Sequence, residues 1–170
     1  MFIFWGEDHI CLYNDSYSQS LGPEKHPSIL GMPGRDAWPE IWPIIGPQID
    51  LVMRGDGATW NENQLVPIFR NGSIEDVYWT YSYGPIDDPR SPSGVGGVLV
   101  VCTETTALVL AERHRLAEID RLRALFDQAP GFMCVLFGPE YVFELANEAY
   151  YQLTGRRELL GKRVIDAFPE

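Results

Sequence analysis

The sequence predicts an α+β fold, in which a five-stranded antiparallel sheet carries short helices on one side and is followed by one long helix. Short apolar runs occur in the order strand, strand, short helices and three more strands, an arrangement typical of this class. The 16 glycines and 13 prolines cluster between these runs and punctuate many short elements. With 45% apolar residues among 170, the chain can bury a core.

The first elements are a hairpin and a set of short helices. Apolar residues 1–5 and 9–13 are parted by Gly6-Glu7-Asp8, which predicts a β-hairpin. Asn14-Asp15-Ser16 supplies an N-cap for a short helix over 17–21. Prolines at positions 27, 33, 39, 43 and 47 predict one-turn helices up to a last helical segment at 49–53.

Three strands are expected next, over 58–70, 74–83 and 95–102. These segments are rich in Val, Ile, Thr and aromatic residues. Asn71-Gly72 separates the first two, and the polar segment 87–94 separates the last two. The glycines at 94, 96 and 97 open a strand and lack the lysine of a phosphate loop, so they indicate a hairpin turn.

Residues 106–128 contain no glycine or proline and predict one continuous helix of roughly 33 Å. Four arginines balance four acidic residues within 107–128, whereas residues 1–106 carry five basic and fourteen acidic groups. We expect this helix to form a weak parallel homodimer, because apolar residues recur on one face with Glu112 and Arg123 interrupting the heptad seam. The dimer residues are Val109, Leu116, Ile119, Leu122 and Phe126.

The chain contains an internal repeat. NDSYSQSLG at 14–22 returns as NEAYYQLTG at 147–155, and DAWPE at 36–40 returns as DAFPE at 166–170. The second copy reaches residue 170 with two predicted strands and short helices, so we expect an incomplete second unit.

The segment LANEAYYQLTGRRELLGK at 145–162 resembles the PAS domain from its second strand onward. GVGGVLVVCTETT at 94–106 resembles the last PAS strand and its Asp-x-Thr exit, with Thr103 where the family commonly has Asp. The resemblance implies a PAS domain at 1–106, a signalling linker at 107–128 and the first part of a second PAS domain at 129–170. WPEIW at 38–42 is similar to PAS units of bacterial hybrid histidine kinases.

The resemblance implies a cytoplasmic sensory module of a bacterial signal-transduction protein, a histidine kinase, that detects a small ligand or a partner. The signal would leave through Thr103, Glu104, Thr105 and Thr106, and Thr105 and Thr106 are expected to cap the long helix. Two alternatives remain: a PAS module that binds no ligand and serves only as a dimerisation element or spacer, and a stand-alone enzyme. No catalytic residue is assigned.

Aromatic residues on the predicted strands and helices are candidates for lining a ligand pocket, although core packing alone also explains them. Bulky rings occupy both alternating faces of 77–83, so the sequence does not decide which of them point inward. The candidates are Trp38, Trp42, Trp60, Phe69, Tyr78, Trp79, Tyr81 and Tyr83.

No cofactor or metal is expected. His9, His26 and His114 show no ligand spacing, and none lies where haem-binding PAS domains carry their axial histidine. The cysteine motif of flavin-binding PAS domains is absent, so Cys11, Cys102 and Cys134 are interpreted as small apolar residues. His114 lacks the flanking residues of a phosphoacceptor.

Two partner classes are disfavoured. A formal net charge of −11 works against binding to nucleic acid. No apolar stretch approaches the roughly 20 residues of a membrane span.

Overall fold

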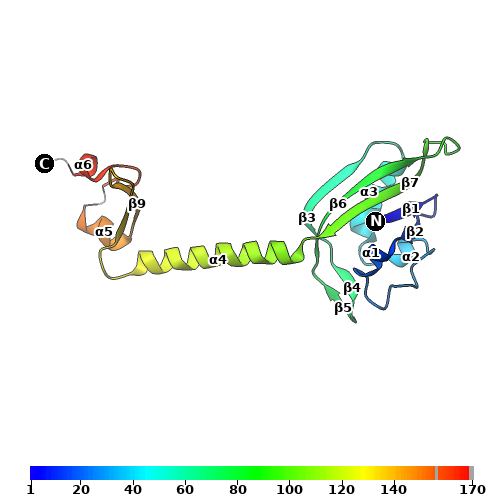
Figure 1. Cartoon of the computed structure of the whole chain (residues 1–170), viewed down its shortest axis with the longest axis horizontal. Helices are drawn as coiled ribbons and strands as arrows, with labels where there is room; N and C mark the ends of the chain where they lie inside the picture. Colours follow the sequence, from blue (N-terminus) through cyan, green and yellow to red (C-terminus); the bar gives the residue numbers. More distant parts are fainter. Residues whose placement is uncertain (156, 169–170) are drawn as a thin grey trace. The chain divides into compact units, whose positions relative to one another are not determined.

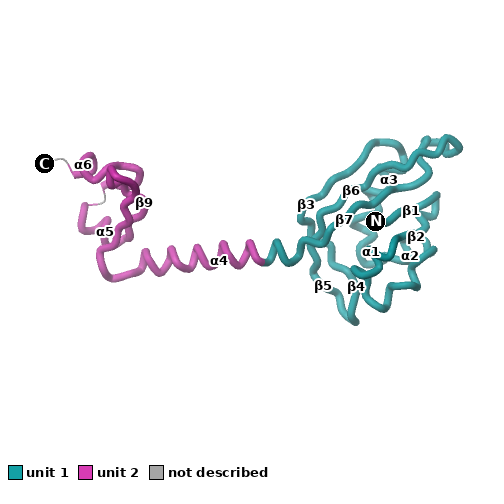
Figure 2. The backbone as a smooth tube through the Cα atoms, in the orientation of Figure 1, with its two compact units in different colours: residues 1–110 teal, residues 111–170 magenta. Residues whose placement is uncertain are grey.

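The computed structural model describes residues 1–155 and 157–168. The chain forms two compact units, residues 1–110 and 111–170 (Figure 2). The units meet within the long helix. The division into residues 1–106, 107–128 and 129–170 therefore stays a prediction.

Unit 1 is built on a five-stranded antiparallel sheet of order β2-β1-β7-β6-β3 (Figure 1). This confirms the predicted α+β class and the five-stranded sheet. The strands are β1 (Phe2–Trp5), β2 (Ile10–Tyr13), β3 (Thr59–Leu65), β6 (Tyr78–Asp87) and β7 (Val95–Glu104).

Glycines allow β1 and β7 to lie close together. Gly97 pairs with Trp5, and a Cβ atom on Gly97 would lie 2.7 Å from the carbonyl oxygen of Phe4. Gly94 has a φ of +77° and ends the turn that leads into β7. The glycine-rich segment is therefore a turn and a strand start, as the sequence predicts.

Two of the predicted strands are each broken in two. The segment expected as one strand over 58–70 contains β3 and β4 (Ile68–Arg70), and the segment over 74–83 begins with the end of β5 (Ser73–Glu75) before β6. Pro67 has no N–H to donate, and the main ladder ends beside it. The β4–β5 hairpin is a separate two-stranded sheet, turned by Asn71 and Gly72, both at positive φ.

The helices of unit 1 are α1 (Asp15–Ser18), α2 (Gly34–Ala37) and α3 (Trp42–Met53), so the predictions of helices over 17–21 and 49–53 had the wrong bounds. Asn14 caps α1 by accepting a hydrogen bond from Tyr17 N, which starts the helix earlier than expected. Pro43 lies in the first turn of α3, where its missing N–H costs nothing. Pro47 removes one further backbone hydrogen bond from the helix. The burial of Ile45, Ile49 and Val52 against the sheet offsets the stability lost with that bond.

The predicted long helix is confirmed as α4 (Thr106–Gln128), which begins directly after β7 (Figure 1). None of its residues is fully buried. In the part of the chain that the structure describes, no helix has both the length and the apolar character needed to cross a membrane.

Beyond α4, unit 2 contains β8 (Cys134–Phe137), β9 (Val142–Ala146), α5 (Glu148–Leu153) and α6 (Val164–Ala167). The strands form an antiparallel pair, and the small core centres on Phe143 and Leu159. Within residues 1–155 and 157–168, the expectation of a strand pair plus helices after residue 130 is confirmed.

The sequence repeat is also a repeat of hydrogen bonds. In unit 1, Cys11 N donates to Met32 O at 2.8 Å, and Gly31 N donates to Cys11 O at 2.8 Å. In unit 2, Phe143 N donates to Lys162 O at 2.9 Å, and Gly161 N donates to Phe143 O at 2.9 Å. The second strand of each unit thus holds the same glycine turn, with Gly31 and Gly161 both at positive φ.

The helix caps repeat as well. Asn14 Oδ1 accepts from the Met1 amino group at 3.0 Å and from Tyr17 N at 3.2 Å. Asn147 Oδ1 accepts from Met133 N at 3.0 Å and from Tyr150 N at 2.9 Å. Each asparagine therefore ties the start of the first strand to the helix that follows the second.

Candidate ligand cavity and signal exit

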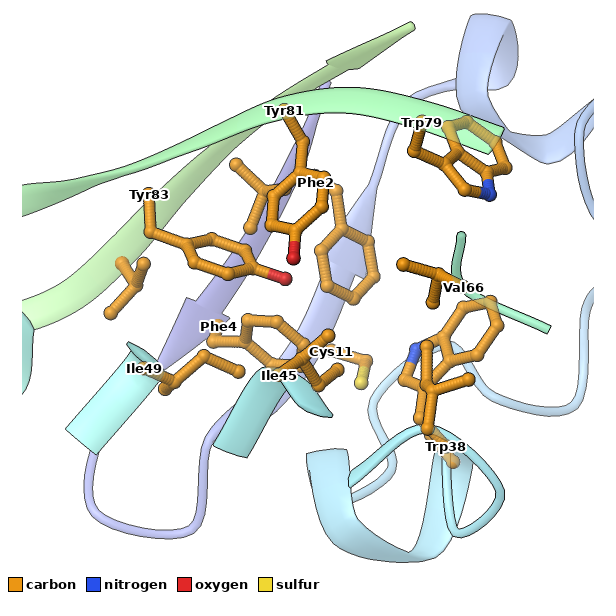
Figure 3. Packing of buried hydrophobic residues seen from close by; sticks show 14 of the residues in the cluster. Phe2, Phe4, Cys11, Trp38, Ile45, Ile49, Val66, Trp79, Tyr81 and Tyr83 are labelled. Carbon is orange, nitrogen blue, oxygen red and sulfur yellow. The ribbon is translucent and has the colours of Figure 1, made fainter. Parts of the chain in front are cut away.

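Alternation along β6 decides which aromatic rings face the core of unit 1. Trp79, Tyr81 and Tyr83 are buried, whereas the even-numbered residues between them are half-exposed. The rings of Tyr81 and Tyr83 extend from β6 toward Phe2 and Phe4 of β1 (Figure 3). The parity that the sequence left open is thus settled by the packing of the odd-numbered residues under the sheet.

A cavity of about 50 Å³ lies in this core. It is about a third of the ~150 Å³ engineered cavity that binds benzene, but it exceeds the space that one water needs. Its walls come from the inner face of the sheet, from α1 and α3, and from β4. They include Phe2, Tyr17, Trp38, Val66, Ile68 and Cys102.

Four of the eight aromatic candidates line this cavity: Trp38, Trp79, Tyr81 and Tyr83. The other four do not. Trp42 packs edge-on against Phe4 at 6.1 Å between ring centroids, and Trp60 is 67% exposed. Phe69 is 39% exposed, and Tyr78 lies on the half-exposed face of β6.

Several cavity residues escaped the sequence analysis, among them Tyr17, Phe2 and Val66. Tyr17 belongs to the repeated segment that starts α1, and its equivalent Tyr150 packs against Phe143 in unit 2. That shared position in the repeat was a usable signal for a core-facing tyrosine.

The cavity favours neutral groups. Burial raises the pKa values of Tyr17 and Tyr83, and it raises the pKa of Cys102 to about 11 and that of the neighbouring Cys11 to about 12. These hydroxyls and thiols are therefore uncharged at neutral pH, and no charged side chain is among the lining residues. The arrangement suits a small uncharged molecule that contacts the aromatic rings.

The hydroxyl of Tyr81 closes a polar bridge between α3 and β3. It donates to Gln64 Oε1 at 2.6 Å and accepts from Gln48 Nε2 at 3.0 Å. Gln48 Oε1 in turn accepts from Asn61 Nδ2 at 2.6 Å. This bridge fixes the edge strand to the helix beside the cavity.

A buried lysine supports the Trp38 wall. Lys25 Nζ lies 4.2 Å from the ring centroid of Trp38, donates to Ala37 O at 2.8 Å and pairs with Glu40 at 2.8 Å. In unit 2, Arg157 lies over Phe168 at 5.6 Å and donates to Ala167 O at 3.3 Å. A cation lies over the aromatic ring in both units. The sequence repeat did not reveal it, because Lys25 and Arg157 lie between the repeated blocks, where the spacing of the two copies differs by three residues.

The residues predicted as the signal exit, Thr103 to Thr106, form the junction of β7 and α4. Thr103 pairs with Thr80, and Thr105 N donates to Tyr78 O at 2.7 Å. The expected capping of α4 is wrong: Thr106 Oγ1 accepts from Tyr78 N at 3.0 Å, and the buried hydroxyl of Thr105 has no hydrogen-bond partner. The strand–helix turn uses these positions to anchor itself to β6.

Glu104, the last residue of β7, binds Arg70. Arg70 donates to it through two nitrogens, at 3.0 and 3.2 Å, and its Nε donates to Glu75 at 2.6 Å. These contacts place a carboxylate at the exit of β7, where Arg70 joins it to the β4–β5 hairpin.

The predicted dimer residues lie on a largely exposed helix. Leu116 and Leu122 are 48% and 56% exposed, while Val109, Ile119 and Phe126 are half-buried. Ile119, Leu122 and Phe126 also border a groove of about 380 Å³ within unit 2.

The histidines and cysteines stay dispersed in the structure. Across residues 1–155 and 157–168, no three His, Cys, Asp or Glu side chains are grouped as a metal site would require. His26 Nδ1 is bonded to the Tyr13 hydroxyl at 3.0 Å. Burial lowers the pKa of His9, against the opposing effect of Asp50 at 4.0 Å.

Comparison with known proteins identifies one part of the chain. No curated protein matches the sequence. Residues 120–170, which contain unit 2's strand pair, its Asn147 cap and its glycine turn, match the family model of the PAS domain, so this part of the chain carries a PAS domain.

Proposed function

We propose that the chain is a sensory and regulatory module in which unit 1 is itself a PAS-type sensor domain and α4 relays its state. The observation that carries this proposal is the set of hydrogen bonds shared by unit 1 and the PAS-matching segment. A PAS domain suggests a sensory role, and unit 1 has a five-stranded sheet with a core cavity in which a ligand would bind.

The proposed signal is a small uncharged molecule bound among Trp38, Tyr17 and Tyr83. Support comes from the ring-lined walls and the absence of charged lining residues around the cavity. Because the volume is about 50 Å³, the ligand has only a few heavy atoms unless the walls move.

Xenon and benzene test this cavity. Xenon should bind the unmodified chain, with NMR shifts confined to residues around Val66 and Tyr83, whereas benzene should not. Ile68→Ala removes three carbons from the wall and enlarges the cavity toward the ~150 Å³ that admits benzene. Absence of xenon shifts, or benzene binding that does not depend on Ile68, would contradict the proposal.

A second candidate function is a ligand-free dimerisation element or spacer. The small cavity and the exposed leucines of α4 favour it. In this case, as in the first, α4 pairs in parallel with a second copy through Val109, Leu116, Ile119, Leu122 and Phe126. A dimer without any small-molecule binding would support the spacer over the sensor.

Analytical ultracentrifugation tests the dimer. Leu116→Glu combined with Ile119→Glu should convert a dimer to a monomer. Leu110→Glu with Ala117→Glu adds the same charge away from the heptad seam and should leave the dimer in place. A monomeric unmodified chain at high concentration would remove the support for pairing.

For the wider setting we propose a cytoplasmic bacterial sensor histidine kinase, supported only by the resemblance of WPEIW at 38–42. The proposal assigns the chain no reaction of its own. Hydrolysis of ATP by the purified chain would favour the enzyme alternative instead.

A further inference from the structure

The β4–β5 hairpin stands between the cavity and the start of α4. Its two strands form a sheet of their own, outside the main sheet. Ile68, at one end of β4, is 4% exposed and lines the cavity. Arg70, at the other end of β4, points its guanidinium at the strand exit.

The Arg70 side chain is the contact between the hairpin and the exit of β7. It is only 18% exposed and binds Glu104 with both terminal nitrogens while its Nε binds Glu75. A guanidinium fork engaged in this way has one orientation, because each nitrogen is committed to a carboxylate oxygen. Glu104 is the last residue of β7 and lies two positions before α4 begins.

The hairpin backbone is also hydrogen-bonded to a side chain that supports the cavity wall. Phe69 N donates to Glu40 Oε1 at 3.1 Å, and the same oxygen pairs with Lys25 Nζ at 2.8 Å. Lys25 lies over the ring of Trp38, which lines the cavity. A series of cation–π, ionic and hydrogen-bonded contacts therefore runs from Trp38 to Phe69 of the hairpin. The backbone continues it to Arg70, which binds Glu104 at the end of β7.

We infer that the β4–β5 hairpin is a lever, and that Arg70 is the positioning residue through which a change at the Trp38 wall alters the first turn of α4. Displacement of Ile68 or Trp38 moves β4, and the Arg70 fork carries that movement to Glu104. This inference rests on the proposed sensory function, since it describes how that function reaches the helix.

Hydrogen exchange on the full chain tests the lever. Val109 N, which donates to Thr105 O, is the amide that reports the first turn of α4. Arg70→Met should raise exchange of the peptide over 105–112 about tenfold, because a charge-assisted pair is lost. Arg90→Met is a control for the loss of an arginine–carboxylate pair elsewhere in unit 1. Arg90 pairs with Asp88 on the surface, and its replacement should leave exchange of this peptide unchanged.

A double-mutant comparison separates transmission from local loosening. Glu40→Gln weakens the contacts of Glu40 with Lys25 and Phe69 N. It should raise exchange over 105–112 when Arg70 is present, but should cause no further increase in the Arg70→Met variant. An equal effect of Glu40→Gln in both backgrounds, or unchanged exchange in Arg70→Met, would overturn the lever. If tryptophan fluorescence shows that Arg70→Met does not fold, Glu104→Gln removes the same pair and carries the same expectation.

The experiment needs no ligand. If the chain shows this coupling but does not bind xenon, the lever is retained and the proposed small-molecule signal is lost. If the chain binds xenon but exchange over 105–112 does not respond to Arg70→Met, the cavity is retained as a binding site and the lever is lost.

Discussion

The side chain of Asn147 makes four hydrogen bonds in unit 2. It is fully buried, accepts from Met133 N and Tyr150 N, and donates to Ala129 O at 3.3 Å and Gly131 O at 2.8 Å. Asn14 makes the same cap in unit 1 but is exposed. We therefore expect this asparagine to contribute more stability in unit 2 than in unit 1.

We predict that Asn147→Ala destabilises unit 2 by about 2–4 kcal/mol. The change removes the helix cap and leaves several buried backbone groups without a hydrogen-bond partner. Asn14→Ala should cost unit 1 only about 1 kcal/mol. All five tryptophans precede residue 80, so fluorescence on urea titration reports unit 1, and hydrogen exchange of 148–153 reports unit 2. Equal costs for the two changes would show that burial of Asn147 adds nothing.

The thiol of Cys102 links stability to alkaline pH. Burial raises its pKa from 9.0 to about 11, so above pH 9 the unfolded chain ionises this thiol while the folded chain keeps its proton. The unfolded state then binds fewer protons, and stability falls as pH rises from 9 to 11.

We expect Cys102→Ala to reduce the loss of unfolding free energy between pH 7 and pH 10 by about 1 kcal/mol, since one pKa unit corresponds to about 1.4 kcal/mol. Urea unfolding followed by tryptophan fluorescence at the two pH values measures it. An unchanged pH dependence in the variant would mean that this thiol ionises in the folded chain as easily as in the unfolded one.

At the scale of elements, α3 shows how packing overrides a local signal. The prolines of this region predicted short helices, yet one helix runs from Trp42 to Met53 with Pro47 inside it. Pro47 is exposed, and its missing N–H leaves the carbonyl of Pro43 without a helical donor.

Pro47→Ala should therefore stabilise unit 1 by about 1–3 kcal/mol, less than the full cost of a mid-helix proline because alanine gives the unfolded chain more freedom. Pro39→Ala, outside the helix, serves as the control. Destabilisation by Pro47→Ala in urea titrations would contradict this interpretation of α3.

Periodicity predicted the elements that are long or flanked by glycine turns. The β1–β2 hairpin, β7 and α4 belong to this group, because alternation or helical spacing is sustained in each. The detached β4–β5 hairpin could not be predicted, because a continuous β-rich run does not show where a ladder ends and a new pair begins. Only the tertiary contacts of Ile68 and Arg70 fix that point.

At the scale of the whole molecule, the internal repeat was the most productive sequence signal. It predicted an incomplete second unit, and the structure shows that this unit repeats the asparagine cap and the glycine turn of unit 1. Residues 120–170 match the PAS model. The cavity was predicted only in part, because residue type alone does not separate Tyr81, which faces the core, from Trp60, which is exposed. The Arg70–Glu104 contact joins residues 34 positions apart and left no local pattern.

The central claim is that the state of the unit 1 cavity reaches α4, and hydrogen exchange of the peptide over 105–112 in Ile68→Ala, with and without benzene, tests it most directly. Loss of the Ile68 side chain should loosen β4 and raise exchange at the first turn of α4, and benzene filling the enlarged cavity should reverse the increase. Benzene that binds, as tryptophan fluorescence reports, yet leaves exchange over 105–112 unchanged would contradict the claim.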